Sequence, residues 1–301
     1  FSQGRFFTKW PRGLRRPVTV LFGDPLPVGT PPADARLALQ ELSAESVRTR
    51  MLAAARRPPS GIEADAWAAH LATAEAFDGC CLVRRDDRLL TSLGPSDPLH
   101  ASLGTHAAAL LGITAASVKS ATSPAALLER LVASRATIWL ASVEQVAALA
   151  ALHAPPQASA MENLAVVVMP VAATSELLAA QAAAAAFLDA FGIEPVTAFA
   201  PREANGLVAM NSPPGRTVAH EATLNRESVG RVVNGVVVWP RAADRERLAR
   251  PPRAAGPLPR DGRSLVIGAT LPGSNDDQPR AVLLSEAFTV DPAGFLVAGD
   301  A

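Results

Sequence analysis

The hydrophobic positions in the middle of the chain follow two periodicities in turn. Apolar residues recur at helical spacing in "ADAWAAHLATAEAF", "SPAALLERLVASR", "VEQVAALAALH" and "SELLAAQAAAAAFLDAF". Each of these segments is followed by a short apolar run typical of a buried strand, namely "GCCLVR", "ATIWLAS", "NLAVVVMPVA" and "EPVTAF". Strands that alternate with helices indicate a three-layer α/β domain with a mainly parallel sheet.

The last part of the chain has a different pattern. The segments "SVGRVVNGVVVWP", "RSLVIGAT" and "RAVLLSEAFTVDPAGFLVAGD" predict strands separated by glycine- and proline-containing turns. Residues 241–263 between them are rich in proline and basic side chains, which is typical of a surface linker. We therefore expect a β-rich C-terminal part.

The first part of the chain predicts one strand and one helix. The run "PVTVLFGDPLPV" alternates β-branched and other residues before a turn, and "PPADARLALQELSAESVRTRMLAAARR" has prolines at its start and basic residues at its end. The composition changes after "RRPPSG". We therefore place a domain boundary near residue 57, with one domain at 1–56 and another at 57–301.

The overall charge excludes one class of partner. The formal net charge is +0 over 301 residues, so the chain has no electrostatic reason to bind nucleic acid. The first twenty residues differ, because basic and aromatic side chains alternate there, including Lys9, Trp10, Arg12, Arg15 and Arg16. This mixture suits an anionic membrane surface or a phospholipid. A solvated basic loop whose aromatic residues enter a core is the alternative.

Cysteine usage and the apolar stretches indicate the compartment. Cys80 and Cys81 are adjacent, which gives neither a disulfide framework nor metal-ligand spacing and favours a reducing cytosol. The stretch 176–193 is mostly alanine and contains charged residues, so it predicts a helix of a globular domain and not a membrane span. The sequence contains no stretch typical of a secretory signal peptide. The chain begins at Phe1 without a methionine, and we expect it to be a fragment of a longer protein.

The order of the segments resembles the large domain of the adenylate-forming (AMP-binding) acyl-activating enzymes. The stretch "FGIEPVTAFAPREANGLVAMN" is similar to the family's loop "FGIxPLEGYGxTExSPVVAVN". The next elements, "ESVGRVVNGVVV", "GRSLVIGAT" and "LSEAFTVDPAGFL", follow the order of the family's strand pair, strand and hairpin. The resemblance covers residues 88–299 and implies the family's three-layer fold.

The resemblance also implies a nucleotide site for ATP or AMP with magnesium. Phe199 stands at the aromatic position that packs against adenine, and Glu203 stands at the glutamate that helps to hold magnesium. Arg202 replaces a threonine that contacts phosphate, and Glu286 replaces the aspartate that binds the ribose hydroxyls. An arginine can pair with phosphate oxygens or fill the pocket. From the residues alone, an acidic residue beside an arginine in such a loop is more often a surface ion pair than a site.

Two features of the family's pattern are missing from the sequence. No glycine-rich phosphate loop of the type "TSGTTGxPKG" occurs. The stretch "TSLGPSDPLHASLG" contains no lysine and fits the family's later "LPLxHxxGLxxG" segment, with Asp97 or His100 near the family's histidine. We interpret His100 as structural. The chain ends where the family enters the hinge to its small lid domain, so we expect no lid here.

The N-terminal part carries a second resemblance. The stretch "GRFFTKWPRGLRRPVTVLFGDPLP" and the helix after it are similar to the end of a glycerophospholipid acyltransferase domain. An acyltransferase followed by an AMP-binding domain is the arrangement of the bifunctional acyl-carrier-protein synthetase/acyltransferases. This implies that a fatty acid, an acyl-carrier protein or coenzyme A, and a lysophospholipid are partners, at the cytoplasmic face of the cell membrane. The catalytic histidine and aspartate of such a domain have no match here, because no histidine has an aspartate five positions later.

Two functional classes remain open from the sequence. In the first, the chain is part of an enzyme that activates a fatty acid with ATP and passes the acyl group to a lysophospholipid. In the second, the AMP-binding part is a non-catalytic scaffold or a docking surface for an acyl-carrier protein. The missing phosphate loop favours the second class for this chain, and the resemblance favours the first.

Overall fold

The computed structural model describes residues 58–152, 161–216, 224–233, 236–240, 266–271, 280–291 and 295–298, with a few positions between 26 and 39. The chain divides into two compact units, Phe1–Ala54 and Ala55–Ala301. The strand and helix expected before residue 57 lie largely outside the described residues, as do Lys9, Trp10, Arg12, Arg15, Arg16 and the linker at 241–263. All of the elements below belong to the second unit.

Helices and strands alternate through the first part of this unit. In chain order they are α2 (Ala64–Cys81), β1 (Arg88–Thr91), the π-helix η1 (His100–Thr105), α3 (Ala107–Leu111), β2 (Thr114–Ser117), α4 (Pro124–Ser134), β3 (Ile138–Leu140), α5 (Val143–Ala150), β4 (Val166–Val171), the 3₁₀ turn η3 (Thr174–Glu176), α6 (Leu177–Phe191) and β5 (Val196–Phe199). The β-rich part follows with β6 (Ala209–Met210), β7 (Ser228–Val232), β8 (Val237–Pro240), β9 (Val266–Leu271), β10 (Arg280–Val290) and β11 (Phe295–Ala298).

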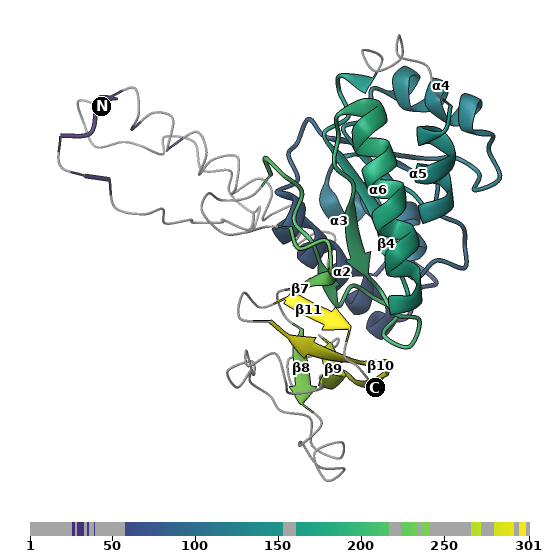
Figure 1. The fold of residues 1–301 in the computed structure, drawn as a ribbon. Helices are drawn as coiled ribbons and strands as arrows, with labels where there is room; N and C mark the ends of the chain where they lie inside the picture. The colour runs from purple at the N-terminus through teal and green to yellow at the C-terminus, as the bar shows by residue number, and fades with distance from the viewer. Residues whose placement is uncertain are drawn as a thin grey trace, which may run out of the picture. The chain divides into compact units, whose positions relative to one another are not determined.

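The described strands form one mixed sheet in the order β2-β1-β3-β4-β5-β6-β7-β11-β10-β9-β8. Strands β1 to β5 are parallel, whereas every pairing from β6 onward is antiparallel (Figure 1). This confirms the α/β fold with a mainly parallel three-layer part and a β-rich C-terminal part.

The two faces of the parallel sheet are covered by different helices. Side chains alternate between the faces along each strand, so Leu89 and Leu90 enter two separate hydrophobic clusters, as do Ile138 and Trp139. One cluster contains residues of α4, α5 and α6, and the other contains residues of α2, η1 and α3. Figure 1 shows α5 and α6 side by side on their face. The connection from β1 to β2 crosses the sheet in the opposite direction to the connections that lead to β3, β4 and β5. Because crossovers are right-handed, it therefore lies over the opposite face.

Local sequence explains several of the boundaries. All six residues of β4 are buried, as expected for a strand covered on both faces. Helix α4 begins after Ser123, whose hydroxyl accepts a hydrogen bond from the Ala126 N–H, and it has Pro124 in its first turn.

The prediction of a strand at "GCCLVR" is wrong. Residues Gly79–Cys81 form the last turn of α2, which ends at Leu82 with a left-handed φ of 44°. Both cysteines are free thiols, and burial raises the pKa of Cys80 to about 11. A thiol of this kind stays protonated at neutral pH.

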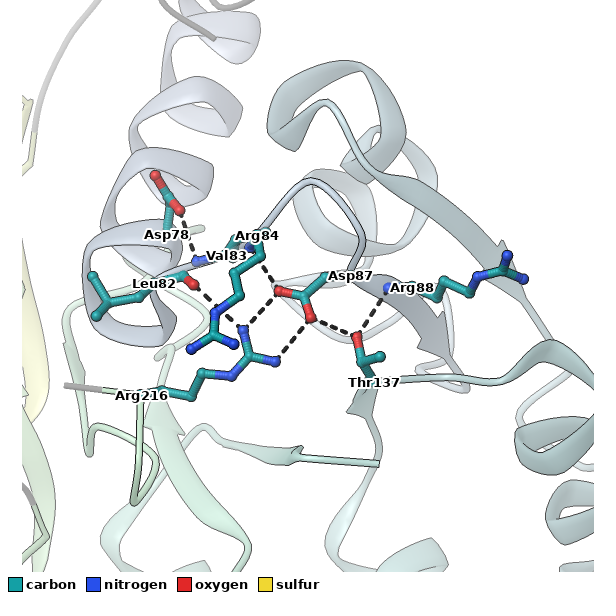
Figure 2. Close-up of polar contacts among 8 residues, drawn as sticks. All are labelled: Asp78, Leu82, Val83, Arg84, Asp87, Arg88, Thr137 and Arg216. Atoms are coloured by element: carbon teal, nitrogen blue, oxygen red, sulfur yellow. Dashed lines mark hydrogen bonds and ion pairs between the residues drawn. The ribbon is translucent and has the colours of Figure 1, made fainter. Parts of the chain in front are cut away.

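A buried ion pair fixes the amino ends of β1 and β3. Asp87 precedes β1, and both of its carboxylate oxygens accept hydrogen bonds of 2.8 Å from the guanidinium of Arg216 (Figure 2). The Arg84 N–H donates to Asp87 Oδ2 at 2.7 Å, and the Thr137 hydroxyl donates to Oδ1 at 2.7 Å. Thr137 precedes β3 and accepts from the Arg88 N–H, so one carboxylate joins both strand ends to the loop after β6.

The electrostatics of Asp87 follow from these partners. Burial raises its pKa, but hydrogen bonds from Arg216, the Arg84 N–H and Thr137 outweigh burial, so the net pKa is lowered. The Asp87 and Arg216 side chains are only 3% and 8% exposed, so neither charge can be rehydrated if its partner is removed.

A second polar contact joins the helices of the opposite face. His70 of α2 is buried, and its Nδ1 lies 3.1 Å from the Ser102 hydroxyl of η1. The ring of His106 lies 5.6 Å from the His70 ring, and Trp67 packs edge-on against both. Burial lowers the pKa of His70, and His106 lowers it further.

No helix within the described residues is long and apolar enough to cross a bilayer.

We predict that Asp87→Ala lowers the free energy of unfolding by about 3–5 kcal/mol, because it leaves the Arg216 charge buried and unpaired. Chemical denaturation at pH 7 measures the change. Asp86→Ala is the matched control, because Asp86 is exposed, and it should change stability by less than about 0.5 kcal/mol. An equal loss of unfolding free energy in the two variants would show that the buried ion pair contributes no more to stability than an exposed carboxylate does.

We also predict that stability falls as the pH drops through the ordinary His pKa of 6.5, because the unfolded chain then binds a proton that folded His70 resists. This contribution is fully present above that pH and decreases below it. In His70→Gln, denaturation curves between pH 5.5 and 7.5 should lose this dependence. An unchanged pH dependence in the variant would contradict the assignment to His70.

Candidate functional site

The parallel part of the sheet contains a topological switch point. Strand β1 pairs with β2 on one side and with β3 on the other, so the chain leaves β1 in one direction and returns on the opposite side. In open α/β sheets, ligands bind outside the carboxyl ends of the strands at such a point. The carboxyl ends of β1, β3, β4 and β5 are therefore the candidate location for a ligand site.

A glutamine fills the crevice between β1 and β3. Gln145 Oε1 accepts from the Ser92 hydroxyl at 2.7 Å and from the Ser142 N–H at 3.1 Å. Its Nε2 donates to the carbonyls of Ser92 and Ser120 at 3.1 and 3.0 Å. Trp139 Nε1 donates to the Ser92 hydroxyl at 3.0 Å. The protein's own side chains thus take up the hydrogen-bonding groups at the switch point.

A cavity opens beside this crevice, toward the ends of β4 and β5. Its volume is about 330 Å³. It is lined by Ser96, Asp97, Pro98, Ser142, Val143, Glu144, Pro170, Val171, Ala172, Ser175, Glu176, Ala179, Ala200 and Arg202. The first turns of α5 and α6 therefore contribute to its wall, and both helix dipoles place their positive ends there.

The charges on the cavity wall are mixed. Asp97, Glu144 and Glu176 are acidic, and Arg202 is the basic residue among the lining side chains. Asp97 Oδ1 accepts from the Leu99 N–H at 2.8 Å. Burial raises the pKa of Asp97 and Glu176 adds to this, whereas the Leu99 N–H, His100 and Arg202 oppose it, and the net pKa is raised. Arg202 and Glu176 therefore act on Asp97 in opposite directions.

Two carboxylates hold the loop at one side of the cavity. Glu176 Oε2 accepts from the Ala172 N–H at 2.9 Å. Glu286 Oε2, which comes from β10, accepts from the Thr174 N–H at 2.7 Å. The loop 172–176 is thus fixed both by its own helix start and by the β-rich part.

The four residues of the expected nucleotide site occupy different surroundings. Arg202 lines the cavity, and Glu286 reaches the loop that borders it. Phe199 is 1% exposed, and its ring packs edge-on against Phe288 with the centroids 4.9 Å apart. Glu203 is exposed and is not part of the cavity lining.

The metal role expected for Glu203 stays a prediction. Within the ranges that the structure describes, no group of three His, Cys, Asp or Glu side chains is arranged to hold a metal ion. His100 Nδ1 lies 3.0 Å from the Leu93 carbonyl, a contact that agrees with a structural histidine.

Sequence reasoning missed Gln145 and Glu176 as parts of this edge. A signal for Gln145 was present, because "SVEQ" has the spacing of a capping box, and Ser142 and Gln145 do form one at the start of α5. Glu176 carries no comparable signal, since its role depends on how the loop after β4 turns.

No protein-family model matches the sequence, and no curated protein matches it. Solved structures do resemble the fold. They include a malonyl-CoA ligase in a complex with methylmalonyl-CoA and AMP (TM-score 0.56, 15% identity, 77% of this chain and 48% of that chain). A benzoate CoA ligase from Burkholderia xenovorans (TM-score 0.53, 16%, 77% and 45%) and an amide bond synthetase from Marinactinospora thermotolerans (TM-score 0.52, 21%, 78% and 44%) are also similar.

The chain spans less than half the length of these three structures. The likeness confirms the adenylate-forming type of fold that the order of segments predicted.

We predict that Gln145→Ala lowers the free energy of unfolding by about 2 kcal/mol, because the hydroxyl and the carbonyl of buried Ser92 each lose their hydrogen bond to the Gln145 side chain. Urea denaturation followed by circular dichroism measures this. Gln181→Ala serves as the control, because Gln181 makes one side-chain hydrogen bond, to the Arg226 carbonyl at the surface. The interpretation of Gln145 as a clamp fails if both variants lose the same small amount.

Proposed function

We propose that this chain binds MgATP and a carboxylic acid at the cavity beside Arg202, as part of an enzyme that activates the acid as an acyl-adenylate. The observation that carries the proposal is the position of this cavity. It lies at the carboxyl ends of parallel strands, next to a switch point, in a fold shared with ligases of which one holds AMP. Its volume of about 330 Å³ lies at the lower end of the usual range for small-molecule sites.

The charges on the wall suit a magnesium-bound nucleotide better than a free one. Arg202 can form bidentate hydrogen bonds with phosphate oxygens. Asp97, Glu144 and Glu176 would repel a free polyphosphate, so a divalent cation is needed to offset them. Magnesium usually binds through substrate phosphates, waters and one or two carboxylates, and such a site needs no three-residue cage. Glu203 is our candidate for one of these carboxylates.

The proposed chemistry is nucleophilic displacement at phosphorus. A substrate carboxylate oxygen bonds to the α-phosphorus of ATP, the bond to the bridging oxygen breaks, and pyrophosphate leaves with that electron pair. Arg202 would stabilise the negative charge that spreads over the phosphoryl oxygens. The thiol of coenzyme A or of an acyl-carrier protein would then displace AMP from the acyl group.

The lipid part of the proposal rests on sequence alone. Residues 1–56 resemble the end of a glycerophospholipid acyltransferase domain, which suggests a fatty acid as the substrate and a lysophospholipid as the final acceptor. Lys9, Trp10, Arg12, Arg15 and Arg16 would contact the membrane at its cytoplasmic face. An in-frame "HxxxxD" upstream of Phe1 would support this part, and its absence would remove it.

A second candidate function is a non-catalytic scaffold or acyl-carrier docking module. Two observations favour it. The ring of Phe199, which would stack on adenine, is buried against Phe288, and the Glu286 carboxylate, which would bind ribose, is hydrogen-bonded to the Thr174 N–H. A scaffold would bind no nucleotide.

We predict that the chain binds MgATP in calorimetry and that Arg202→Met weakens binding about ten- to a hundred-fold, because a charge-assisted hydrogen bond to phosphate is lost. Arg130→Met is the matched control, since Arg130 is an exposed residue of α4, and it should bind like the unchanged chain. Glu203→Gln should weaken binding of MgATP but not of AMP without magnesium. No binding to folded protein would sink the enzyme proposal and favour the scaffold.

A further inference from the structure

The β-rich part reaches the candidate site through an irregularity in β10. Leu283 pairs with Gly268 of β9, and Phe288 pairs with Val266. The chain thus advances by five residues along β10 over a stretch in which β9 advances by two. The residues between Leu283 and Phe288 form an irregular bulge, in which β10 has three more residues than β9. Bulges re-aim side chains and are frequent next to active sites. Glu286 lies within this bulge.

The bulge places two side chains against the α/β part. Glu286 and Phe288 are two positions apart, and both contact the carboxyl edge of the parallel sheet. Glu286 Oε2 accepts from the Thr174 N–H at 2.7 Å, and Phe288 packs on Phe199 with the ring centroids 4.9 Å apart. Phe288 is fully buried, whereas Glu286 is half-buried. The hydrophobic contact anchors the bulge, and the hydrogen bond ties it to the loop beside the cavity.

This arrangement has an electrostatic consequence for the cavity. The loop that Glu286 holds contributes Ala172, Ser175 and Glu176 to the cavity wall. Asp97, Glu144 and Glu176 already give the wall three carboxylates against the single charge of Arg202. The carboxylate of Glu286 adds a further negative charge at the border and occupies a backbone N–H at the start of η3. An incoming phosphate meets repulsion there as long as Glu286 stays in place.

We infer that Glu286 is an autoinhibitory latch, which fixes the loop 172–176 through the Thr174 N–H and must release it before a phosphate-bearing ligand enters the cavity. The ligand part of this inference rests on the proposed function. The latch differs from the role that the family resemblance gives to this position, in which the carboxylate holds the ligand. Removing the carboxylate should strengthen nucleotide binding if Glu286 is a latch and weaken it if Glu286 holds the ribose.

Hydrogen exchange tests the latch without any ligand. In ¹⁵N-labelled protein, Glu286→Ala should raise the exchange rate of the Thr174 amide about ten-fold, as expected for the loss of a charge-assisted hydrogen bond. Glu286→Gln should give a smaller rise, because its amide oxygen is a weaker acceptor. The Arg84 amide is an internal control, since it donates to the Asp87 carboxylate outside this loop. Glu129→Ala, at an exposed position of α4, controls for loss of a carboxylate elsewhere.

Calorimetry with MgAMP tests the consequence for binding. The latch predicts that Glu286→Ala binds MgAMP about three- to ten-fold more tightly than the unchanged chain and the Glu129→Ala variant. Weaker or unchanged binding in Glu286→Ala overturns the latch, and weaker binding would restore the ribose role. An unchanged exchange rate of the Thr174 amide also overturns it.

The two proposals fail in different ways. If no variant binds MgAMP while the Thr174 amide is released in Glu286→Ala, the nucleotide function fails and the hold of Glu286 on the loop stands. If the unchanged chain binds MgAMP but the Thr174 amide is unaffected, the function stands and the latch fails. Thermal unfolding of each variant shows that the compared proteins are folded.

Discussion

The parallel pairing of β1 with both β2 and β3 is the constraint on which the rest of the structure depends. A strand paired on both sides cannot shift its register without breaking two ladders and moving its side chains between the two hydrophobic clusters. Polar side chains fix this strand at each end. Asp87 joins its amino end to β3 and the loop after β6, and Gln145 joins its carboxyl end to β3 and the loop after β2.

The position of Gln145 at the switch point explains where the cavity lies. Because Gln145 fills the crevice at the switch point, the open space lies toward β4 and β5, where the first turns of two helices meet. The β-rich part extends the sheet, and it also reaches the border of the cavity through Glu286 in the bulge of β10. The chemistry of the cavity is thus set jointly by the α/β part and by a strand more than a hundred residues later in the chain, since Glu286 and Thr174 are 112 residues apart.

Much of the fold could be predicted from the sequence, because hydrophobic periodicity is a local property. The continuous apolar run of β4 and the helical spacing of apolar residues in α4 predicted those elements directly. Local pattern failed at Gly79–Cys81, because a short apolar run fits the end of a buried helix as well as a strand.

The site was harder to predict, because its contacts are non-local. The family resemblance indicated Arg202 as a phosphate contact, and Arg202 lines the cavity, but its contact with a phosphate stays a prediction. Phe199 packs against Phe288, and the Thr174 N–H donates to Glu286. Both contacts depend on a bulge in β10 that no sequence pattern predicts. Sequence pattern can nominate such residues, but it cannot say whether they face a ligand or another part of the chain.

The pairing of Asp87 with Arg216 has a consequence for the order of folding. The two residues are 129 positions apart, and at about 5–20 residues per second a ribosome needs about 6–26 s to add the second after the first. During that interval β1 to β5 can be made, but the Asp87 carboxylate lacks its Arg216 partner. Burial of the amino edge of the parallel sheet is therefore less favourable until the loop after β6 has been made.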